Sequence, residues 1–182
     1  MKTYISLLRG INVSGQRPIR MDALRKSYEN LGFHNVTTYV QSGNVIFTAK
    51  STIINTLEQK ISRQIEKDFG YEVPVIVLAI DKLKEIMADN PFLNHSSIDQ
   101  TFLHFTFLSR KPDKYDRQEI ESKKQNGEEI FIAANVVYLY CPNGYGKSKL
   151  NNNFLETKLK VEATTRNWKT TNNLLKIAQQ IT

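Results

Sequence analysis

Cysteine and histidine are scarce in this sequence, and their scarcity excludes two kinds of stabilising site. The single cysteine, Cys141, cannot form a disulfide within the chain. The three histidines, His34, His95 and His104, are scattered, with no metal-ligand spacing around them. We therefore expect no internal disulfide and no structural metal.

Long hydrophobic runs are also absent. No stretch approaches the roughly 20 apolar residues that a membrane helix requires. The first residues, MKTYISLLRG, contain too short an apolar stretch for a signal peptide and no small-residue cleavage site. The sequence predicts a cytoplasmic protein without a membrane partner.

The composition of the chain suits a folded protein. With 182 residues, 40% of them hydrophobic and 24% charged, the chain can bury a sizeable core as one domain or as two small domains that share an interface. Intrinsic disorder is excluded by the same numbers.

The net charge of +7 is concentrated at the two ends of the chain. Residues 1–25 carry five basic side chains and one acidic side chain. Residues 26–145 carry thirteen basic and fifteen acidic side chains, and residues 146–182 carry seven basic and two acidic side chains. A field of one sign attracts phosphates, nucleic acid or acidic protein surfaces. A bias toward solubility, without any ligand, is the alternative interpretation.

Hydrophobic periodicity predicts a β-α-β-β-α-β order for the first eighty residues. The predicted strands are 2–9, 36–41, 44–49 and 72–79, and the predicted helices are 21–32 and 51–70. Ser42 and Gly43 form a two-residue connection typical of a tight hairpin. This order is the split βαβ pattern of a ferredoxin-like sandwich.

The predicted topology brings distant polar residues to one edge of the first sheet. In a split βαβ unit the first two strands run parallel with the third between them, so their C-terminal ends share an edge. The segment LLRGINVSGQRPIRM starts there and carries Arg9, Arg17 and Arg20 with no carboxylate until Asp22. We expect this edge to gather Arg9, Asn12, Gln41, Ser42 and Asn44.

The second half predicts a further α+β subdomain. Expected elements are a short helix within 81–92 that breaks before Pro91, a strand over 101–109, a charged helix over 111–125, a hairpin within 128–144, a helix beginning within 145–159 and a last helix over 167–181. We place the boundary near residue 80. Residues 1–80 form the ferredoxin-like subdomain, and residues 81–182 form a related α/β sandwich with a mainly antiparallel sheet, tightly packed on the first.

Five separated blocks resemble the signature of a widespread bacterial family, domain of unknown function 1697. The blocks are LLRGINVSG, YVQSGNVIF, NPF, YLYCPNGYGKSKL and ATTRNW, in the order of the family and spanning nearly the whole chain. Ser14 stands where family members often have glycine, a change of one small residue for another. The resemblance implies two α+β subdomains, the first ferredoxin-like, and it implies no activity.

Together the blocks supply hydrogen-bond donors, an aromatic pair and no carboxylate. The candidate ligand-binding residues are Arg9, Asn12, Gln41, Ser42, Asn44, Tyr145, Lys147, Ser148, Lys149, Arg166, Asn167 and Trp168. Such cations, amides and hydroxyls suit an anion, and glycines let backbone N–H groups approach phosphate oxygens. We predict a basic cleft for a nucleotide, a phosphorylated metabolite or nucleic acid, with Arg9, Lys147 and Arg166 around one anion.

The same motifs have structural interpretations. Gly10 and Gly15 can serve only tight turns, Trp168 can anchor a core, and the blocks can be joints between the two subdomains. The segment GYGKSK is not a P-loop, because Cys141 occupies the position of the first glycine of that motif.

No catalytic constellation stands out, so catalytic residues and cofactors are left unassigned. Cys141 precedes Pro142 at a strand end, where a structural role is expected. The leading hypothesis is a binding module, and the second is a small enzyme acting on a nucleotide or phosphorylated metabolite. A small-ligand pocket is favoured over single-stranded RNA, because Tyr4 is the only aromatic residue in the first strand.

Overall fold

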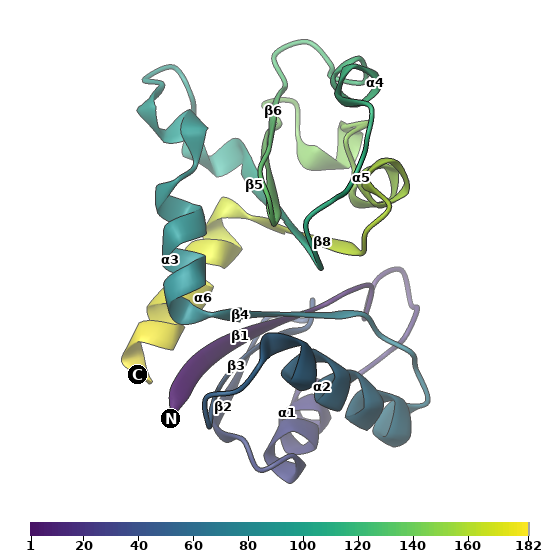
Figure 1. Cartoon of the computed structure of the whole chain (residues 1–182), viewed down its shortest axis with the longest axis vertical. Helices are drawn as coiled ribbons and strands as arrows, with labels where there is room; N and C mark the ends of the chain where they lie inside the picture. The colour runs from purple at the N-terminus through teal and green to yellow at the C-terminus, as the bar shows by residue number, and fades with distance from the viewer. Residues whose placement is uncertain (182) are drawn as a thin grey trace. The chain divides into compact units, whose positions relative to one another are not determined.

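A computed structural model describes residues 1–181 of the chain, which divides into two compact units. The first unit contains Met1–Glu85 together with the residues from Asn173 on, and the second contains Ile86–Asn172. The chain leaves the first unit within α3 (Ile80–Ala88) and returns to it within α6 (Trp168–Gln180). Each unit has its own four-stranded sheet (Figure 1).

The first unit has the predicted β-α-β-β-α-β order. Its elements are β1 (Lys2–Leu8), α1 (Met21–Asn30), β2 (His34–Tyr39), β3 (Asn44–Ala49), α2 (Ile54–Phe69) and β4 (Val75–Ala79). The strands are arranged β2-β3-β1-β4, and each neighbouring pair is antiparallel. β1 and β2 therefore run parallel with β3 between them, which confirms the predicted crossover.

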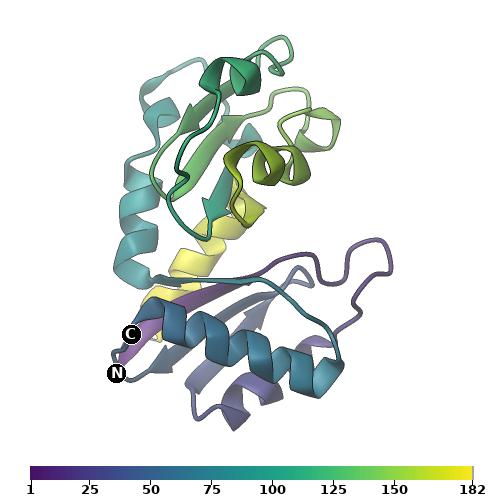
Figure 2. The same cartoon turned by 45° about the vertical axis from the view of Figure 1, so that its right-hand side comes forward.

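One face of the first sheet forms a core with α1 and α2, which lie on the same side of it in Figure 2. Strand alternation puts Tyr4 and Leu8 of β1 on this face. The ring of Tyr4 stacks on that of Phe47, with 5.7 Å between centroids. Leu24 and Ile61 add the apolar sides of the two helices, and all five residues are buried.

The opposite face of the first sheet carries Thr3, Ile5 and Leu7, which are buried as well. The C-terminal part of α6 belongs to this side. Its Asn173 Nδ2 donates a hydrogen bond of 2.7 Å to the hydroxyl of Tyr39, the last residue of β2. A helix from the far end of the sequence thus completes the first unit.

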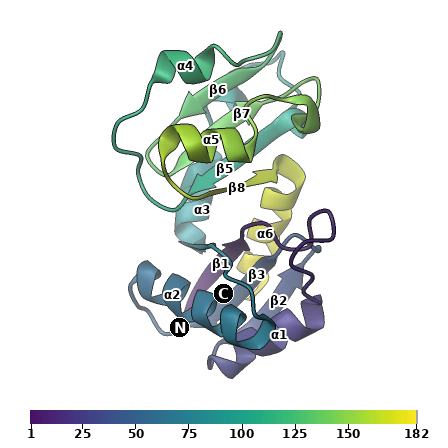
Figure 3. The ribbon, with the colours of Figure 1, turned by 90° about the vertical axis from the view of Figure 1, so that its right-hand side faces the viewer.

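The second unit is built on the antiparallel sheet β6-β7-β5-β8, labelled in Figure 3. Its elements are η1 (Pro91–Asn94), η2 (Gln100–Phe102), β5 (Leu103–Leu108), α4 (Arg117–Glu121), β6 (Glu129–Ile132), β7 (Val136–Tyr140), η3 (Tyr145–Lys147), α5 (Asn152–Leu159) and β8 (Ala163–Asn167), where η marks a 3₁₀ helix. The predicted α+β class with a mainly antiparallel sheet is confirmed.

The two faces of the second sheet bury different side chains. Val137 and Leu139 of β7 pack in a core with Ile120 of α4 and Leu155 of α5. The other face is aromatic: the ring centroid of Phe105 lies 6.1 Å from that of Phe107 and 5.9 Å from that of Tyr138.

Two helices of the second unit are shorter than predicted. The charged segment 111–125 forms only the five-residue α4, whose N-cap Asp116 accepts a hydrogen bond from the Glu119 amide. It has a single buried residue, Ile120, so no apolar stripe extends it. The segment 145–159 begins as η3, and α5 starts later, at Asn152.

Strand β8 was not predicted at all. Its sequence ATTRN has no apolar alternation, and it becomes a strand by pairing with β5 in the register Thr106↔Thr165. Tertiary pairing, rather than local pattern, determines this strand.

The first hairpin and the division of the chain also differ from expectation. The turn of the hairpin spans four residues, 40–43, instead of two, because β2 ends at Tyr39. Residues 81–85 and those from 173 on, which the prediction placed in the second subdomain, lie in the first unit. Amphipathic spacing identifies a helix and its apolar side, but it does not specify which sheet the helix covers.

Candidate functional site

The C-terminal ends of β1 and β2 meet at one edge of the first sheet, as predicted. Both Leu7 and Tyr39 are paired with Asn44, the first residue of β3. The amide of Leu8 donates to the carbonyl of Gly43 at 2.8 Å. Two connections therefore leave this edge side by side: residues 9–20, here called the arginine loop, and residues 40–43, here called the hairpin turn.

The arginine loop has an unusual backbone. Asn12, Ser14 and Arg17 have positive φ angles of 54°, 49° and 45°, and Gly10 and Gly15 are also left-handed. The loop is a small hairpin closed by the amide of Asn12, which donates to the carbonyl of Arg17 at 3.2 Å. Left-handed non-glycine residues are strained by roughly 1 kcal/mol or more each, and such strain clusters at functional sites.

The side chain of Asn12 ties the two connections together. Its Nδ2 donates to the carbonyls of Ile19 and Gln41, both at 2.9 Å, and its Oδ1 accepts from the amide of Ile19 at 2.8 Å. All of these partners are backbone groups. Asn12 therefore sets the shape of the edge, and its amide is committed to that structural role.

Gly43 lets the hairpin turn approach β1 closely. A Cβ atom at this position would lie 2.7 Å from Leu8 Cβ and 2.8 Å from Ile11 Cδ1, and the φ of Gly43 is +77°. Both Leu8 and Ile11 are buried. Only glycine fits here without displacing the base of the arginine loop.

Two other predicted residues of the hairpin serve its own turn. Asn44 is buried, and its Nδ2 donates to the Tyr39 carbonyl at 3.0 Å and to Ser42 Oγ at 2.9 Å. The Gln41 carbonyl is the acceptor for Asn12. These contacts support the structural interpretation of the QSGN block.

The cations of the arginine loop differ in their partners. Arg20 forms an ion pair with Asp22 at 2.9 Å, and its own side chain is 84% exposed. Arg17, in contrast, forms no ion pair within residues 1–181. Its guanidinium lies against Gly10, with Nη1 3.6 Å from the position of a Cβ on that glycine. This places the Arg17 charge beside the residue that follows Arg9.

In the second unit a hydroxyl network surrounds Thr165, which the sequence did not single out. Thr165 Oγ1 accepts from the Tyr145 hydroxyl at 3.1 Å, donates to Asn152 Oδ1 at 3.1 Å and contacts Thr106 Oγ1 at 2.8 Å. The Tyr145 ring also stacks on His104, with 4.8 Å between centroids. Threonines on neighbouring strands are too common for the sequence alone to identify this network.

The remaining predicted residues of the second unit lie on two faces of its sheet. Arg166 is paired with Phe105, whereas Asn167 is paired with His104, so their side chains point to opposite sides. Trp168 stacks on Phe105, with 5.9 Å between centroids. Tyr145 lies on the His104 side.

Arg166 and Asn167 each have local hydrogen bonds. Arg166 is buried, and its Nη1 donates to Thr164 Oγ1 at 2.7 Å and to the Thr165 carbonyl at 2.9 Å. Asn167 Oδ1 accepts from the amide of Thr170 at 2.8 Å, in the first turn of α6. Asn167 therefore caps the start of α6.

The basic YGKSK segment is mostly solvent-exposed. Lys147 and Lys149 are exposed, and the Lys147 carbonyl accepts from Gln125 Nε2 at 3.0 Å. Ser148 is buried and its Oγ accepts from the Leu150 amide at 3.1 Å. Arg9 belongs to the first unit and the other cations of the expected three-cation site belong to the second, so the meeting of Arg9, Lys147 and Arg166 stays a prediction.

Cys141 lies in an environment that suppresses thiol reactivity. Burial raises the pKa of the Cys141 thiol to about 12, and the charge of Glu128 adds a smaller contribution in the same direction. A hydrogen bond from Ser148 lowers the pKa and offsets part of this rise. The reactive thiolate is therefore scarce at neutral pH.

We expect iodoacetamide at about pH 8 to leave the native thiol unmodified and to label it rapidly after unfolding in urea. Mass spectrometry of the labelled chain measures both rates. Fast labelling of the native protein with an unchanged circular dichroism spectrum would contradict the buried placement of Cys141.

Within residues 1–181, no three side chains among His, Cys, Asp and Glu gather in a way that could hold a metal ion. The same residues contain no helix that is both long and apolar enough to cross a bilayer.

Comparison with known proteins identifies a family and a similar fold. A family model described as protein of unknown function, DUF1697, matches residues 1–138. Among solved structures the chain is similar to the conserved bacterial protein SP0830 from Streptococcus pneumoniae, with a TM-score of 0.72, 21% sequence identity and coverage of 97% of this chain and 98% of that chain. A search of curated proteins found no significant match. At this identity the structural likeness shows the fold.

Proposed function

Because the chain belongs to the DUF1697 family of proteins of unknown function, we propose a function from its own geometry: it binds a phosphate-bearing ligand at the edge formed by the arginine loop and the hairpin turn. The observation that carries the proposal is the guanidinium of Arg17, which lies against Gly10 and has no ion-pair partner within residues 1–181. An anion is the natural partner for a guanidinium held in this way.

The backbone of the loop adds donors to this charge. Ser14 and Gly15 lie at the tip, both left-handed, and within residues 1–181 their amides donate no backbone hydrogen bond. Successive N–H groups in such turns form concave sites that bind phosphate oxygens. The charge of Arg17 together with these amides supports recognition of a phosphate group.

The edge is also held in a fixed shape before a ligand arrives. Asn12 connects the arginine loop to the hairpin turn through three hydrogen bonds, and Gly43 allows the close approach of that turn to β1. Preorganisation of this kind reduces the conformational entropy that the loop loses when a ligand binds.

Arg17→Gln is expected to weaken anion binding about tenfold or more, because it removes a charge-assisted hydrogen bond. Inorganic phosphate at 100 times its Kd should stabilise the wild type by about 2.7 kcal/mol and raise its Tm by several degrees, and the rise should shrink in the variant. Differential scanning calorimetry over a phosphate titration measures the effect.

Arg20→Gln is the matched control, because Arg20 lies in the same loop but is paired with Asp22. It should leave the phosphate effect almost unchanged. Equal losses in both variants would indicate general charge screening instead of a site, and the absence of any phosphate effect on the wild type would refute the proposal.

Two further measurements identify the kind of ligand. Binding of single-stranded RNA should weaken steeply with salt if basic residues of the loop release counterions. A nucleotide that binds more tightly than phosphate, with little dependence on salt, would favour a small ligand.

A turnover assay with pooled nucleotides and Mg²⁺ distinguishes a binding module from the small enzyme that is the second hypothesis.

A further inference from the structure

A cavity lies at the end of the first sheet opposite the arginine loop, beside the first residues of β1. It has a volume of about 400 Å³ and is lined by Met1, Lys2, Thr3, His34, Asn35, Thr48, Ala79, Ile80, Asp81, Lys84 and Ile181. All of these residues belong to the first unit. The volume is within the usual range for small-molecule sites.

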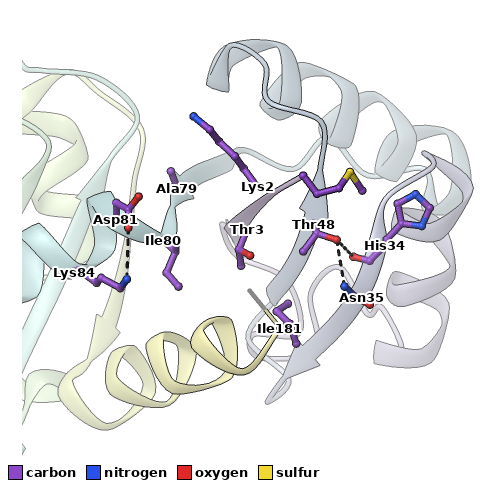
Figure 4. Close-up of a pocket in the computed structure, with 11 residues that line it drawn as sticks. Lys2, Thr3, His34, Asn35, Thr48, Ala79, Ile80, Asp81, Lys84 and Ile181 are labelled. Atoms are coloured by element: carbon purple, nitrogen blue, oxygen red, sulfur yellow. Dashed lines mark hydrogen bonds and ion pairs between the residues drawn. The ribbon is translucent and has the colours of Figure 1, made fainter.

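The floor of the cavity is polar. Thr3 and Thr48 are direct cross-strand partners on β1 and β3, and both are buried. Thr48 Oγ1 donates to the His34 carbonyl at 3.2 Å and lies 3.5 Å from Asn35 Nδ2. Figure 4 shows these groups on the β-sheet side of the cavity.

An irregularity in β2 directs one of these polar groups. The register of β2 against β3 shifts between His34 and Thr37, and Asn35 within this bulge has a φ of +50°. A bulge re-aims a side chain, and bulges are frequent beside binding sites. Here it brings the Asn35 amide to the Thr48 hydroxyl, so the strained residue contributes a donor to the cavity.

The remaining walls are apolar and basic. Ile80 at the start of α3 and Ile181 after α6 line the cavity and are labelled in Figure 4. Lys84, one turn further along α3, forms an exposed ion pair of 3.5 Å with Asp81. Such pairs contribute little to stability, so the Lys84 ammonium remains available to a ligand. Lys2 forms no ion pair within residues 1–181 and gives the rim a net positive charge.

We propose that this cavity binds a small organic acid, with its carboxylate at Lys84, its polar substituents on Thr48 and Asn35, and its apolar part between Ile80 and Ile181. The cavity is separate from the edge formed by the arginine loop and the hairpin turn. A test of the cavity therefore does not decide whether phosphate binds at that edge. Its ligand is distinguished from phosphate by the apolar walls, which an inorganic anion would leave unused.

Three probes with one hydrocarbon chain test the proposal: hexanoate, 1-hexanol and hexylamine. Amide chemical shifts of the whole labelled chain are followed by NMR during titration. Hexanoate should shift the amides of Thr3, Thr48 and Ile80 and bind about tenfold or more tightly than hexanol, because a charge-assisted hydrogen bond is added. Hexylamine should bind most weakly.

Lys84→Gln should reduce hexanoate affinity about tenfold and leave hexanol affinity unchanged. Lys82→Gln, on the same helix but outside the cavity and paired with Glu85, is the matched control and should change neither. Equal binding of hexanoate and hexanol would overturn the assignment to an acid. The absence of shifts at Thr3 and Thr48 with every probe at millimolar concentration would overturn the site itself.

Discussion

Gly43→Ala is expected to destabilise the first unit by about 2 to 5 kcal/mol, the sum of a left-handed backbone penalty and an overpacked contact. The new methyl group would lie 2.7 Å from Leu8 Cβ and 2.8 Å from Ile11 Cδ1. Both neighbours are buried, so neither can move without displacing the core or the base of the arginine loop. The turn would have to shift away from β1.

The measurement must report on the first unit. Trp168, the only tryptophan, lies in the second unit, so its fluorescence follows the wrong part of the chain. Native-state hydrogen exchange of the β1 and β3 amides is the suitable probe. Gly15→Ala is the control: its φ is +75°, but no atom lies within 4 Å of the added Cβ, so only the backbone penalty of about 1 to 2 kcal/mol applies. Equal losses in both variants would show that the close contact at Gly43 costs nothing.

Asn12→Asp is expected to destabilise the edge by about 1 to 4 kcal/mol at neutral pH, although the side chains have the same shape. The amide nitrogen that donates to the carbonyls of Ile19 and Gln41 would become an oxygen 2.9 Å from each. Two hydrogen bonds would be replaced by two repulsive contacts. The arginine loop should separate from the hairpin turn, and phosphate affinity should fall with it.

The pH dependence of this loss has a definite sign. Repulsion disfavours the charged form of the introduced carboxyl, so its pKa in the folded state rises above the unfolded value of about 3.9. The folded state then binds the proton more tightly, and the loss relative to the wild type should shrink as pH falls through the folded pKa.

Asn12→Gly serves as the companion variant. Glycine tolerates the φ of +54° at this position and removes the donors without adding charge, so its loss should not depend on pH in this way. Chemical denaturation at several pH values compares the two. A loss in Asn12→Asp that is independent of pH would contradict the contact between this side chain and the two carbonyls.

The first unit could be predicted from the sequence because its signals are local and agree with one another. Alternation in β1 separates Tyr4 and Leu8 from Ile5 and Leu7, and the structure buries the two sets on opposite faces. The split βαβ rule then placed Arg9 near the hairpin turn. The hairpin turn is longer than predicted, because the left-handed Val40 extends it and is not a typical turn residue.

The second unit was less predictable because its shape depends on contacts between distant residues. Strand β8 forms by pairing with β5, and Thr165 gains its role from Thr106, 59 residues away in sequence. The composition of the five sequence blocks indicated hydrogen-bond donors, but it did not show which of them already donate to backbone groups of the protein. The structure shows that the amides of Asn12 and Asn44 bind backbone carbonyls, so part of the predicted ligand set supports the backbone.

The route of the chain through α6 affects how the protein is made on the ribosome. Ile86–Asn172 are complete before the residues from Asn173 on have been synthesised, yet those last residues belong to the first unit. At translation rates of about 5 to 20 residues per second, the intervening segment takes roughly 4 to 17 seconds to produce. During that interval the nascent sheet lacks the helix segment on its Ile5 and Leu7 face, so two side chains that are buried in the finished protein stay uncovered.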